Sequence, residues 1–172
     1  MTKSEVRTVT LGKLMIRPDD VVVDVGAGTG SVTVACAMEA RHVYSVECKE
    51  EACELIKENV ENFNLQNVTL LQGMAPDVMN DIPLVDRIFC GGTRGNMAAI
   101  LDWADAHLKP QGIVVGNFVT QENATDFIRT LKAHGYINLD IVRMAISKGK
   151  PVGSVTMMEA YNPITIIKGV RP

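Results

Sequence analysis

Residues 21–37, VVVDVGAGTGSVTVACA, constrain the fold more than any other part of the chain. An apolar run over residues 21–25 has the composition of a buried strand, three glycines follow at alternate positions, and an apolar helical pattern comes next. Glycines so placed let the backbone turn sharply and let a ligand approach without a Cβ in the way. The stretch therefore predicts a strand, a ligand-binding glycine loop and a helix.

The rest of the chain alternates short β-branched runs with amphipathic helical stretches. Helical spacing of apolar residues is found in residues 52–63, 97–108 and 124–131, the last with Thr120 as a candidate N-cap. Such alternation is typical of a doubly wound α/β fold, with a mainly parallel sheet wrapped by helices on both faces. The strands predicted in this part are residues 21–25, 42–47, 67–72, 84–91 and 112–119.

The alternation ends near the C-terminus. Residues 136–146, 155–158 and 163–168 have strand patterns with no helix between them, and the turn-rich segment KGKPVG joins them. We therefore expect an antiparallel hairpin at the sheet. At the other end, residues 2–5 have the spacing of a capping box that opens a helix. No linker, repeat or low-complexity tract interrupts residues 1–172, so we expect a single domain.

The glycine loop separates two classes of ligand. A dinucleotide site requires GxGxxG, whose last glycine would fall at position 31, but Ser31 stands there. The pattern is instead Asp24-x-Gly-x-Gly-x-Gly, and here the chain resembles the class I S-adenosylmethionine-dependent methyltransferases. The resemblance implies a Rossmann-like α/β fold with a doubly wound, mainly parallel seven-stranded sheet that ends in an antiparallel hairpin. It also implies S-adenosylmethionine as cofactor.

The same resemblance implies the residues of the cofactor pocket. Asp24 matches the acid near the amino-acid end of the cofactor, and the loop from Gly26 matches the segment near its carboxylate and sugar. Glu47, at the end of the next strand, matches the acid that accepts bonds from the two ribose hydroxyls. Ala75 matches a contact to the adenine, while Thr2 matches a ligand contact that a helix cap explains nearly as well. The expected cofactor-binding residues are Thr2, Asp24, Gly26, Ala27, Gly28, Thr29, Gly30, Glu47 and Ala75.

The loop after the fourth predicted strand bears on the substrate. Enzymes that methylate exocyclic base nitrogens commonly carry Asn/Asp-Pro-Pro-Tyr/Phe there, whereas this chain has FCGGTRGN at residues 89–96. Aromatic residues are 5% of the chain and its net charge is −3, a poor basis for stacking bases or neutralising phosphates. Nucleic-acid substrates are therefore disfavoured.

Three segments narrow the resemblance to one branch of these methyltransferases. They are MTKSEVR at the start, FCGG at residues 89–92 and NPITII at residues 162–167. They resemble the decarboxylating cobalt-precorrin-6B methyltransferases of cobalamin biosynthesis, and the resemblance runs from residue 1 to residue 169. It implies methylation of carbon 15 of a tetrapyrrole, loss of the ring C acetate as carbon dioxide, and a homotetramer. It favours the standalone form over the longer fused enzyme of the oxygen-dependent route.

A substrate with many carboxylates predicts cationic and backbone N–H contacts. Arg94 is the first candidate, because guanidinium pairs bidentately with carboxylate. Gly91 and Gly92 either line the bottom of the substrate site or form a tight turn. Asn117 either binds substrate or makes a hydrogen bond to the backbone. The expected substrate-binding residues are Gly91, Gly92, Arg94 and Asn117, followed by Lys148 and Lys150. No residue stands out as a catalytic acid or base, and nothing beside Cys90 suggests an activated thiolate.

Other features narrow the class of protein. The four cysteines form no CxxC pair and the three histidines are far apart, so neither a metal site nor a disulfide framework is expected. Charged and polar residues interrupt every apolar run before membrane-spanning length, and the charged start lacks the apolar stretch of a signal peptide, which predicts a cytoplasmic protein. The alternatives are a methyltransferase acting on RNA or a protein side chain, a non-catalytic S-adenosylmethionine-binding protein and a nicotinamide enzyme.

Overall fold

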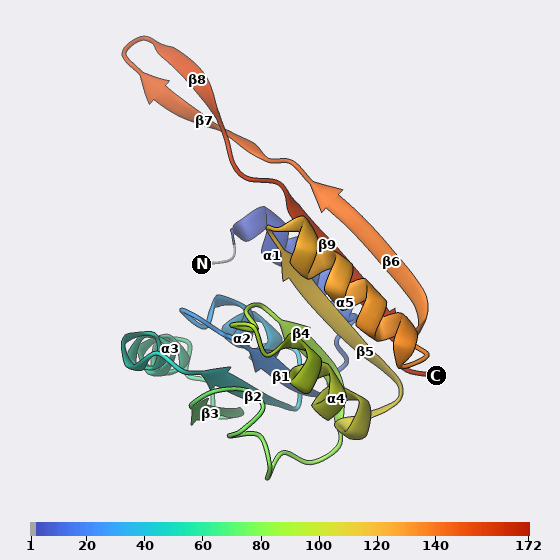
Figure 1. Cartoon of the computed structure of the whole chain (residues 1–172). Helices are drawn as coiled ribbons and strands as arrows, with labels where there is room; N and C mark the ends of the chain where they lie inside the picture. Colours follow the sequence, from blue (N-terminus) through green and yellow to red (C-terminus); the bar gives the residue numbers. More distant parts are fainter. Residues whose placement is uncertain (1–2) are drawn as a thin grey trace.

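The structure is a computed structural model that describes residues 3–172 of the chain (Figure 1). Thr2, which the sequence suggested as a ligand contact or helix cap, lies outside the described residues. In chain order the elements are α1 Ser4–Leu14, β1 Val21–Val25, α2 Ser31–Ala37, β2 His42–Glu47, α3 Glu50–Asn62, β3 Val68–Gln72, β4 Val85–Cys90, α4 Met97–His107, β5 Leu108–Phe118, α5 Gln121–Ala133, β6 Ile137–Met144, β7 Ser147–Val152, β8 Val155–Ala160 and β9 Ile164–Val170.

The main sheet has seven strands in the order β3-β2-β1-β4-β5-β9-β6. Strands β1 to β5 are parallel, while β9 is antiparallel to both of its neighbours. The predicted doubly wound, mainly parallel sheet with an antiparallel pair at its end is confirmed. From β1 the chain adds β2 and β3 on one side of the sheet and then β4 and β5 on the other, so the strand order reverses between β1 and β4. Ligands of open α/β sheets bind at such a switch point.

Helices cover both faces of this sheet. On one face α1 packs against β5 and β9, and α2 packs against β1 and β2. On the other face α5 packs against β5 and β9 and also contacts α4. The buried apolar side chains divide accordingly into two clusters, one under each helical layer. The middle of the sheet is therefore covered on both faces, and β1 is buried along its whole length.

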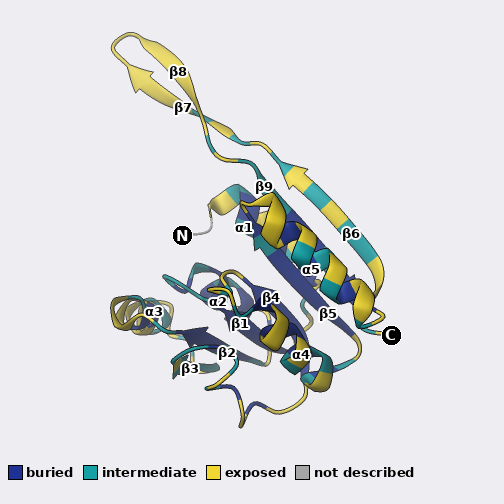
Figure 2. Cartoon of the chain, in the orientation of Figure 1, coloured by how far each residue is buried: buried dark blue, intermediate teal, exposed yellow. Residues whose placement is uncertain are grey.

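Figure 2 shows that β7 and β8 form an exposed arm beyond the main sheet. The two strands pair only with each other, and every residue from 151 to 160 is exposed. The prediction that KGKPVG is a turn is wrong, because most of it lies in β7. The turn is Gly153-Ser154, where Gly153 has a φ of 60° that suits the first position of a two-residue hairpin loop.

The helix starts differ from the sequence pattern in detail. Helix α1 has Lys3 rather than Thr2 as its cap residue, and no side-chain cap bond forms there. Thr120 does precede α5 as predicted, but its side chain makes no cap bond either. Within residues 3–172 no helix is long and apolar enough to cross a membrane.

The parallel strands bring their carboxyl ends to one edge of the sheet. There β1 leads into the glycine loop, β2 ends in Glu47, β3 leads into Gly73 and β4 into Gly91. Register places Val25 beside both Val46 and Cys90, so the ends of β1, β2 and β4 are level. The loops that the sequence singled out therefore meet at this edge.

Candidate active site

Two of the cavities at this edge share the glycine loop as a wall. The smaller has a volume of about 260 Å³ and lies over the ends of β2 and β3. The larger, of about 440 Å³, lies towards α1 and the base of the arm. Gly26 and Gly28 line both cavities. Groups bound in the two cavities would therefore contact the same loop.

Backbone contacts hold the glycine loop in place. The Gly26 and Ala27 N–H groups donate to the carbonyl of Val46 (2.9 and 3.1 Å), which ties the loop to β2. Gly26 has a φ of 72°, and its Cα faces the backbone of Gly92 so closely that a Cβ would overlap it. Glycine is required at position 26 for both reasons.

Glu47 fixes the loop from the other side. Its Oε2 accepts the N–H of Gly28 (2.8 Å), and its Oε1 accepts the N–H groups of Cys48 and Lys49 (both 2.9 Å). Burial opposes ionisation, but the N–H donors of Lys49, Gly28 and Cys48 outweigh it and hold the pKa of Glu47 below its ordinary value. The carboxylate is thus ionised, and Oε2 retains a lone pair for a ligand hydroxyl.

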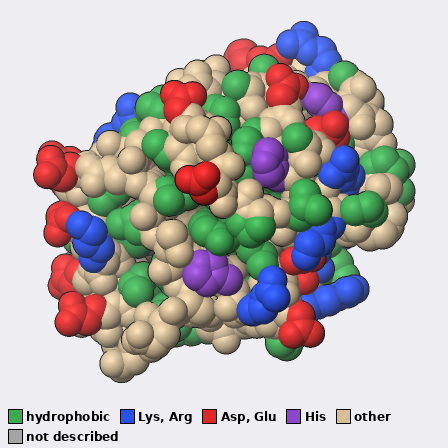
Figure 3. All heavy atoms as spheres, turned by 90° about the horizontal axis from the view of Figure 1, so that it is seen from below, with side chains coloured by type: hydrophobic (Ala, Val, Ile, Leu, Met, Phe, Trp, Pro, Cys, Tyr) green, Lys and Arg blue, Asp and Glu red, His purple; other side chains and the backbone are tan. Residues whose placement is uncertain are grey.

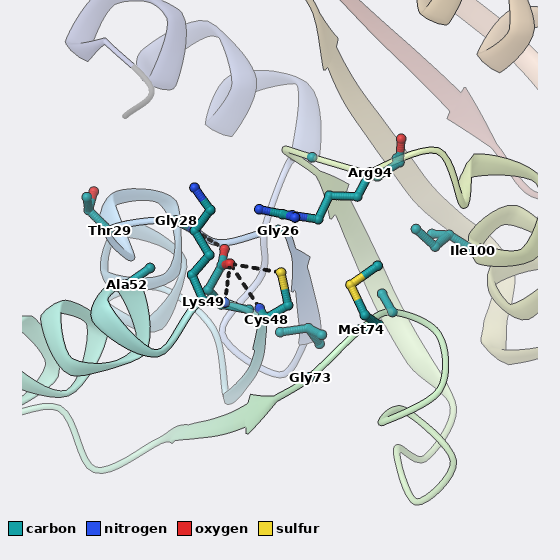
Figure 4. Close-up of a pocket in the computed structure, with 15 residues that line it drawn as sticks. Gly26, Gly28, Thr29, Cys48, Lys49, Ala52, Gly73, Met74, Arg94 and Ile100 are labelled. Carbon is teal, nitrogen blue, oxygen red and sulfur yellow. Dashed lines mark hydrogen bonds between the residues drawn. The ribbon is translucent and has the colours of Figure 1, made fainter.

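The smaller cavity combines this carboxylate with apolar walls and one guanidinium. Figure 4 shows Met74 and Ile100 on one side, Ala52 on the other, and Arg94 reaching across towards Gly26. Arg94 has a φ of 46°, in the left-handed region that is uncommon for a residue with a Cβ. The cavity thus offers an acceptor for hydroxyls, an apolar slot and two cationic residues, Arg94 and Lys49.

Asp24 lies below the loop and is fully buried. Its Oδ2 accepts the hydroxyl of Thr33 (2.6 Å), which also bonds the Ser45 hydroxyl (2.9 Å), whereas its Oδ1 has no partner among the described residues. Asp24 lines neither cavity. Burial raises the pKa of Asp24 to about 6, because desolvation outweighs the hydrogen bonds from Thr33.

This raised pKa predicts a pH-dependent penalty on folding. Between the ordinary pKa of 3.8 and about 6 the folded chain holds a proton that the unfolded chain has lost, so stability falls as pH rises through that window. Asp24→Asn keeps an acceptor for Thr33 and carries no charge. We expect the difference in unfolding free energy, variant minus wild type, to grow by about 3 kcal/mol between pH 3.5 and pH 7. Urea denaturation at both pH values measures it, and a difference that does not change with pH would contradict this account.

The larger cavity is mostly apolar with a few polar groups. Val6, Val32, Phe89 and Ile164 supply part of its apolar wall. Its polar side chains come from distant parts of the chain and are those of Lys3, Asn117, Tyr161 and Asn162. A cavity of this kind fits a large ligand with an apolar body and polar substituents.

The structure divides the sequence-predicted residues between the two cavities. Of the expected cofactor residues, five line the smaller cavity, namely Gly26, Gly28, Thr29, Glu47 and Ala75. Ala27 lines the larger cavity, and Gly30 lines neither, because it caps α2 and packs against Ile56. Of the expected substrate residues, Gly91 and Asn117 line the larger cavity, whereas Gly92 and Arg94 line the smaller.

The alternatives left open for Asn117 are also resolved in part. Its Nδ2 donates to the Thr10 hydroxyl (2.9 Å), which itself donates to the carbonyl of Val6 (2.8 Å). Asn117 therefore bonds a side chain of α1 rather than the backbone, while still lining the larger cavity.

Other candidates lie outside both cavities. Lys148 pairs with Glu5 (2.8 Å) and Lys150 with Glu159 (3.8 Å), and neither lysine lines either cavity. Burial raises the pKa of the Cys90 thiol to about 12, so Cys90 is a packing residue and not a nucleophile. Among residues 3–172, no three His, Cys, Asp or Glu side chains are grouped to hold a metal ion.

Sequence reasoning missed several lining residues. The smaller cavity is also lined by Cys48, Lys49 and Ala52, which follow Glu47 within the next few residues. Their closeness in sequence to that acid could have indicated them. Lys3 and Tyr161 of the larger cavity are far apart in sequence, and only the packing of α1 against the arm brings them together.

The strand order, the glycine loop and the carboxylate at the end of β2 define a class I methyltransferase. The same fold occurs in a solved S-adenosylmethionine-dependent O-methyltransferase from Thermotoga maritima, with a TM-score of 0.83 at 18% identity over 99% of this chain and 66% of that one. A profile of the precorrin methyltransferase domain matches residues 1–171. The chain belongs to the precorrin methyltransferase family.

Two further relatives agree with this membership. A protein of Methanocaldococcus jannaschii named probable cobalt-precorrin-6B C(15)-methyltransferase (decarboxylating) is 40% identical over 171 residues, which cover 99% of this chain and 91% of the relative. A crystal structure of precorrin-6Y C5,15-methyltransferase from Geobacter metallireducens has a TM-score of 0.94 at 34% identity, covering 99% of this chain and 91% of that one.

Proposed function

We propose that this chain methylates carbon 15 of cobalt-precorrin-6B and removes the ring C acetate as carbon dioxide, in the anaerobic route to cobalamin. The observation that carries the proposal is the pair of cavities that share Gly26 and Gly28, in a chain of the precorrin methyltransferase family. The proposal takes residues 1–172 as one catalytic domain acting in the cytoplasm.

The smaller cavity fits S-adenosylmethionine. Glu47 would accept bonds from the ribose hydroxyls, and the apolar slot between Ala52, Met74 and Ile100 would hold the adenine. Arg94 lies in this cavity, so the carboxylate it would meet is that of the cofactor. Asp24 is buried beneath the loop and bonds Thr33 of α2, so it would act on the cofactor through the position of that helix. When bound there, S-adenosylmethionine supplies the methyl group.

The larger cavity would hold the reacting edge of the macrocycle. Carbon nucleophiles of a reduced tetrapyrrole are enamine-like and attack without a strong protein base, and the conjugated ring accepts the electrons released by decarboxylation. The protein then has to orient the ring and exclude water, and holding reacting atoms about 3–3.5 Å apart supplies much of the rate. The apolar wall and the shared loop suit this role, which explains why no acid–base pair is needed in the cavity.

Anaerobic incubation with cobalt-precorrin-6B and methyl-labelled S-adenosylmethionine, read by mass spectrometry, tests the proposal. Gain of one labelled methyl with loss of one carbon dioxide is expected. Methyl gain without that loss would leave methylation standing and overturn the decarboxylation. An unchanged tetrapyrrole with S-adenosylmethionine still bound would overturn the substrate.

The charge of the protein surface bears on one alternative, a methyltransferase that acts on RNA. On the face shown in Figure 3, acidic and basic side chains are interspersed. A net charge of −3 also gives the chain no general attraction to phosphates. The tetrapyrrole therefore remains the better substrate, because its carboxylates need only local cations.

We also propose that the chain assembles as a homotetramer through the β7–β8 arm. An isolated two-stranded sheet is marginally stable in water. Val155 and Met157 lie on one face of β8 and are 61% and 57% exposed, so the arm needs a covering surface. Further copies of this chain would provide it.

Replacing both residues, Val155→Lys with Met157→Lys, should break the assembly. The wild type is expected to sediment at four times the chain mass of 18.7 kDa and the variant at a smaller mass, with cofactor affinity retained. The exposed pair Glu54→Gln with Lys57→Gln on α3 serves as the control for surface change. A wild type that sediments as a single chain would contradict the assembly.

A further inference from the structure

The mouth of the larger cavity lies where the start of α1 meets the base of the arm. Tyr161 follows β8, and its N–H donates to the carbonyl of Ile146 just before β7 (2.9 Å), which closes the base of the arm. Lys3 and Tyr161 both line the cavity, one from each side. The cavity is therefore completed by two segments that are far apart in the chain.

Two contacts connect these segments. The Lys3 ammonium lies over the Tyr161 ring, 3.3 Å from its centroid. The Lys148 ammonium binds the Glu5 carboxylate at 2.8 Å, and this bond holds the pKa of Glu5 down at about 2. The ion pair and the cation–π contact together fix the position of Lys3 relative to the arm.

Lys3 differs from the neighbouring lysines because its ammonium group has N–H donors that no carboxylate of the described residues occupies. Lys148 and Lys150 are each paired with a carboxylate. Within residues 3–172 no carboxylate pairs with Lys3, and Lys3 is the one charged side chain in the described lining of the larger cavity. A ring face holds an ammonium group without taking up its N–H donors, so those donors remain free for an anion.

We infer that Lys3 binds a peripheral carboxylate of the tetrapyrrole in the larger cavity, and that Tyr161 is the positioning residue that holds its ammonium over the cavity mouth. This inference rests on the proposed function, since it assigns a contact within the same site. A macrocycle with acetate and propionate groups on its rim presents its apolar face to Val6, Phe89 and Ile164 and an anionic edge to Lys3. An ammonium meets such a carboxylate as a point charge without a fixed bidentate geometry.

The test measures binding of cobalt-precorrin-6B in the presence of S-adenosylhomocysteine, which prevents turnover. Lys3→Gln is expected to raise the dissociation constant of the tetrapyrrole by about tenfold or more, since charge-assisted bonds are worth that much. Lys3→Arg should restore most of the affinity. Lys57→Gln on α3, which removes the same charge from the surface, is the matched control and should stay within about twofold, the range of an exposed pair. Affinity for S-adenosylhomocysteine should be unchanged in all three variants.

Tyr161 is tested by a double-mutant cycle with Lys3. Tyr161→Leu should weaken tetrapyrrole binding in the wild type but cost little more in the Lys3→Gln background, whereas Tyr161→Phe should behave as wild type. Additive losses would show that the ring acts only through packing and would overturn the positioning role.

The two proposals fail in different ways. A wild type that binds the tetrapyrrole while Lys3→Gln binds it equally well overturns the role of Lys3 and leaves the proposed function intact. A wild type that binds S-adenosylhomocysteine but no tetrapyrrole overturns the proposed function, and the role of Lys3 with it.

Discussion

Gly26→Ala is expected to abolish detectable cofactor binding and to lower the free energy of unfolding by about 3 kcal/mol. The added Cβ would lie 2.7 and 2.9 Å from the N and Cα of Gly92, and closer still to its carbonyl oxygen. These are backbone atoms, so no rotamer change relieves the overlap. The φ of 72° adds strain for any residue with a Cβ. Calorimetric titration with S-adenosylhomocysteine and urea denaturation measure the two effects.

Gly153→Ala provides the matched control for Gly26→Ala. Gly153 has a φ of 60°, and no atom lies within 4 Å of the place that an added Cβ would take, so this variant introduces the strain without the overlap. We expect it to cost about 1 kcal/mol and to leave cofactor affinity unchanged. Equal losses in the two variants would show that the contact between the two loops is unimportant.

Glu47→Gln is the second large effect, with cofactor affinity expected to fall by about a hundredfold. The neutral side chain loses the charge that Gly28, Cys48 and Lys49 solvate, and its amide group directs N–H donors at backbone N–H groups. It also weakens the bonds available to the ribose hydroxyls. Calorimetric titration with S-adenosylhomocysteine gives the value.

Glu54→Gln on α3 controls for the loss of one negative charge near the site. Glu54 is 65% exposed and pairs with Lys57, so its replacement should change affinity by less than about twofold. If Glu47→Gln retained wild-type affinity, the smaller cavity would not be the cofactor site as we describe it.

The parallel core of the fold was predictable because the strands can be recognised from their own local sequence. Residues 21–25 are valines around Asp24 and are buried throughout, residues 42–47 contain Val43, Tyr44 and Val46, and the structure ends β1 and β2 at the predicted residues. Glu47 was predictable for a related reason. The carboxyl ends of parallel strands meet at one edge, so an acid at the end of β2 must lie near the loop that follows β1.

The arm and the larger cavity were not predictable in the same way. Lys148–Gly153 has the glycines and proline of a turn, yet β8 pairs with it and leaves only Gly153-Ser154 as the turn. Proline is tolerated at position 151 because β7 is an edge strand on one side. The contact of Lys3 with Tyr161 has no local signal at all, since it depends on how α1 packs beside the arm.

The sequence predicted Arg94 as a substrate contact, and the structure places it in the lining of the smaller cavity. Its charge predicted a carboxylate contact, but its φ of 46° turns the chain after Gly92 so that the guanidinium extends towards Gly26 (Figure 4). A backbone turn of this kind depends on the loop as a whole, and residue types alone do not reveal it.

The shared wall of the two cavities has a thermodynamic consequence. Gly26 and Gly28 line both, so a ligand that orders the loop from one side changes the surface that the other ligand meets. Reciprocity then requires that each ligand alters the affinity of the other by the same factor. An inhibitor built for the larger cavity would consequently change how tightly the spent cofactor binds, and its own potency would depend on how much of that cofactor is present.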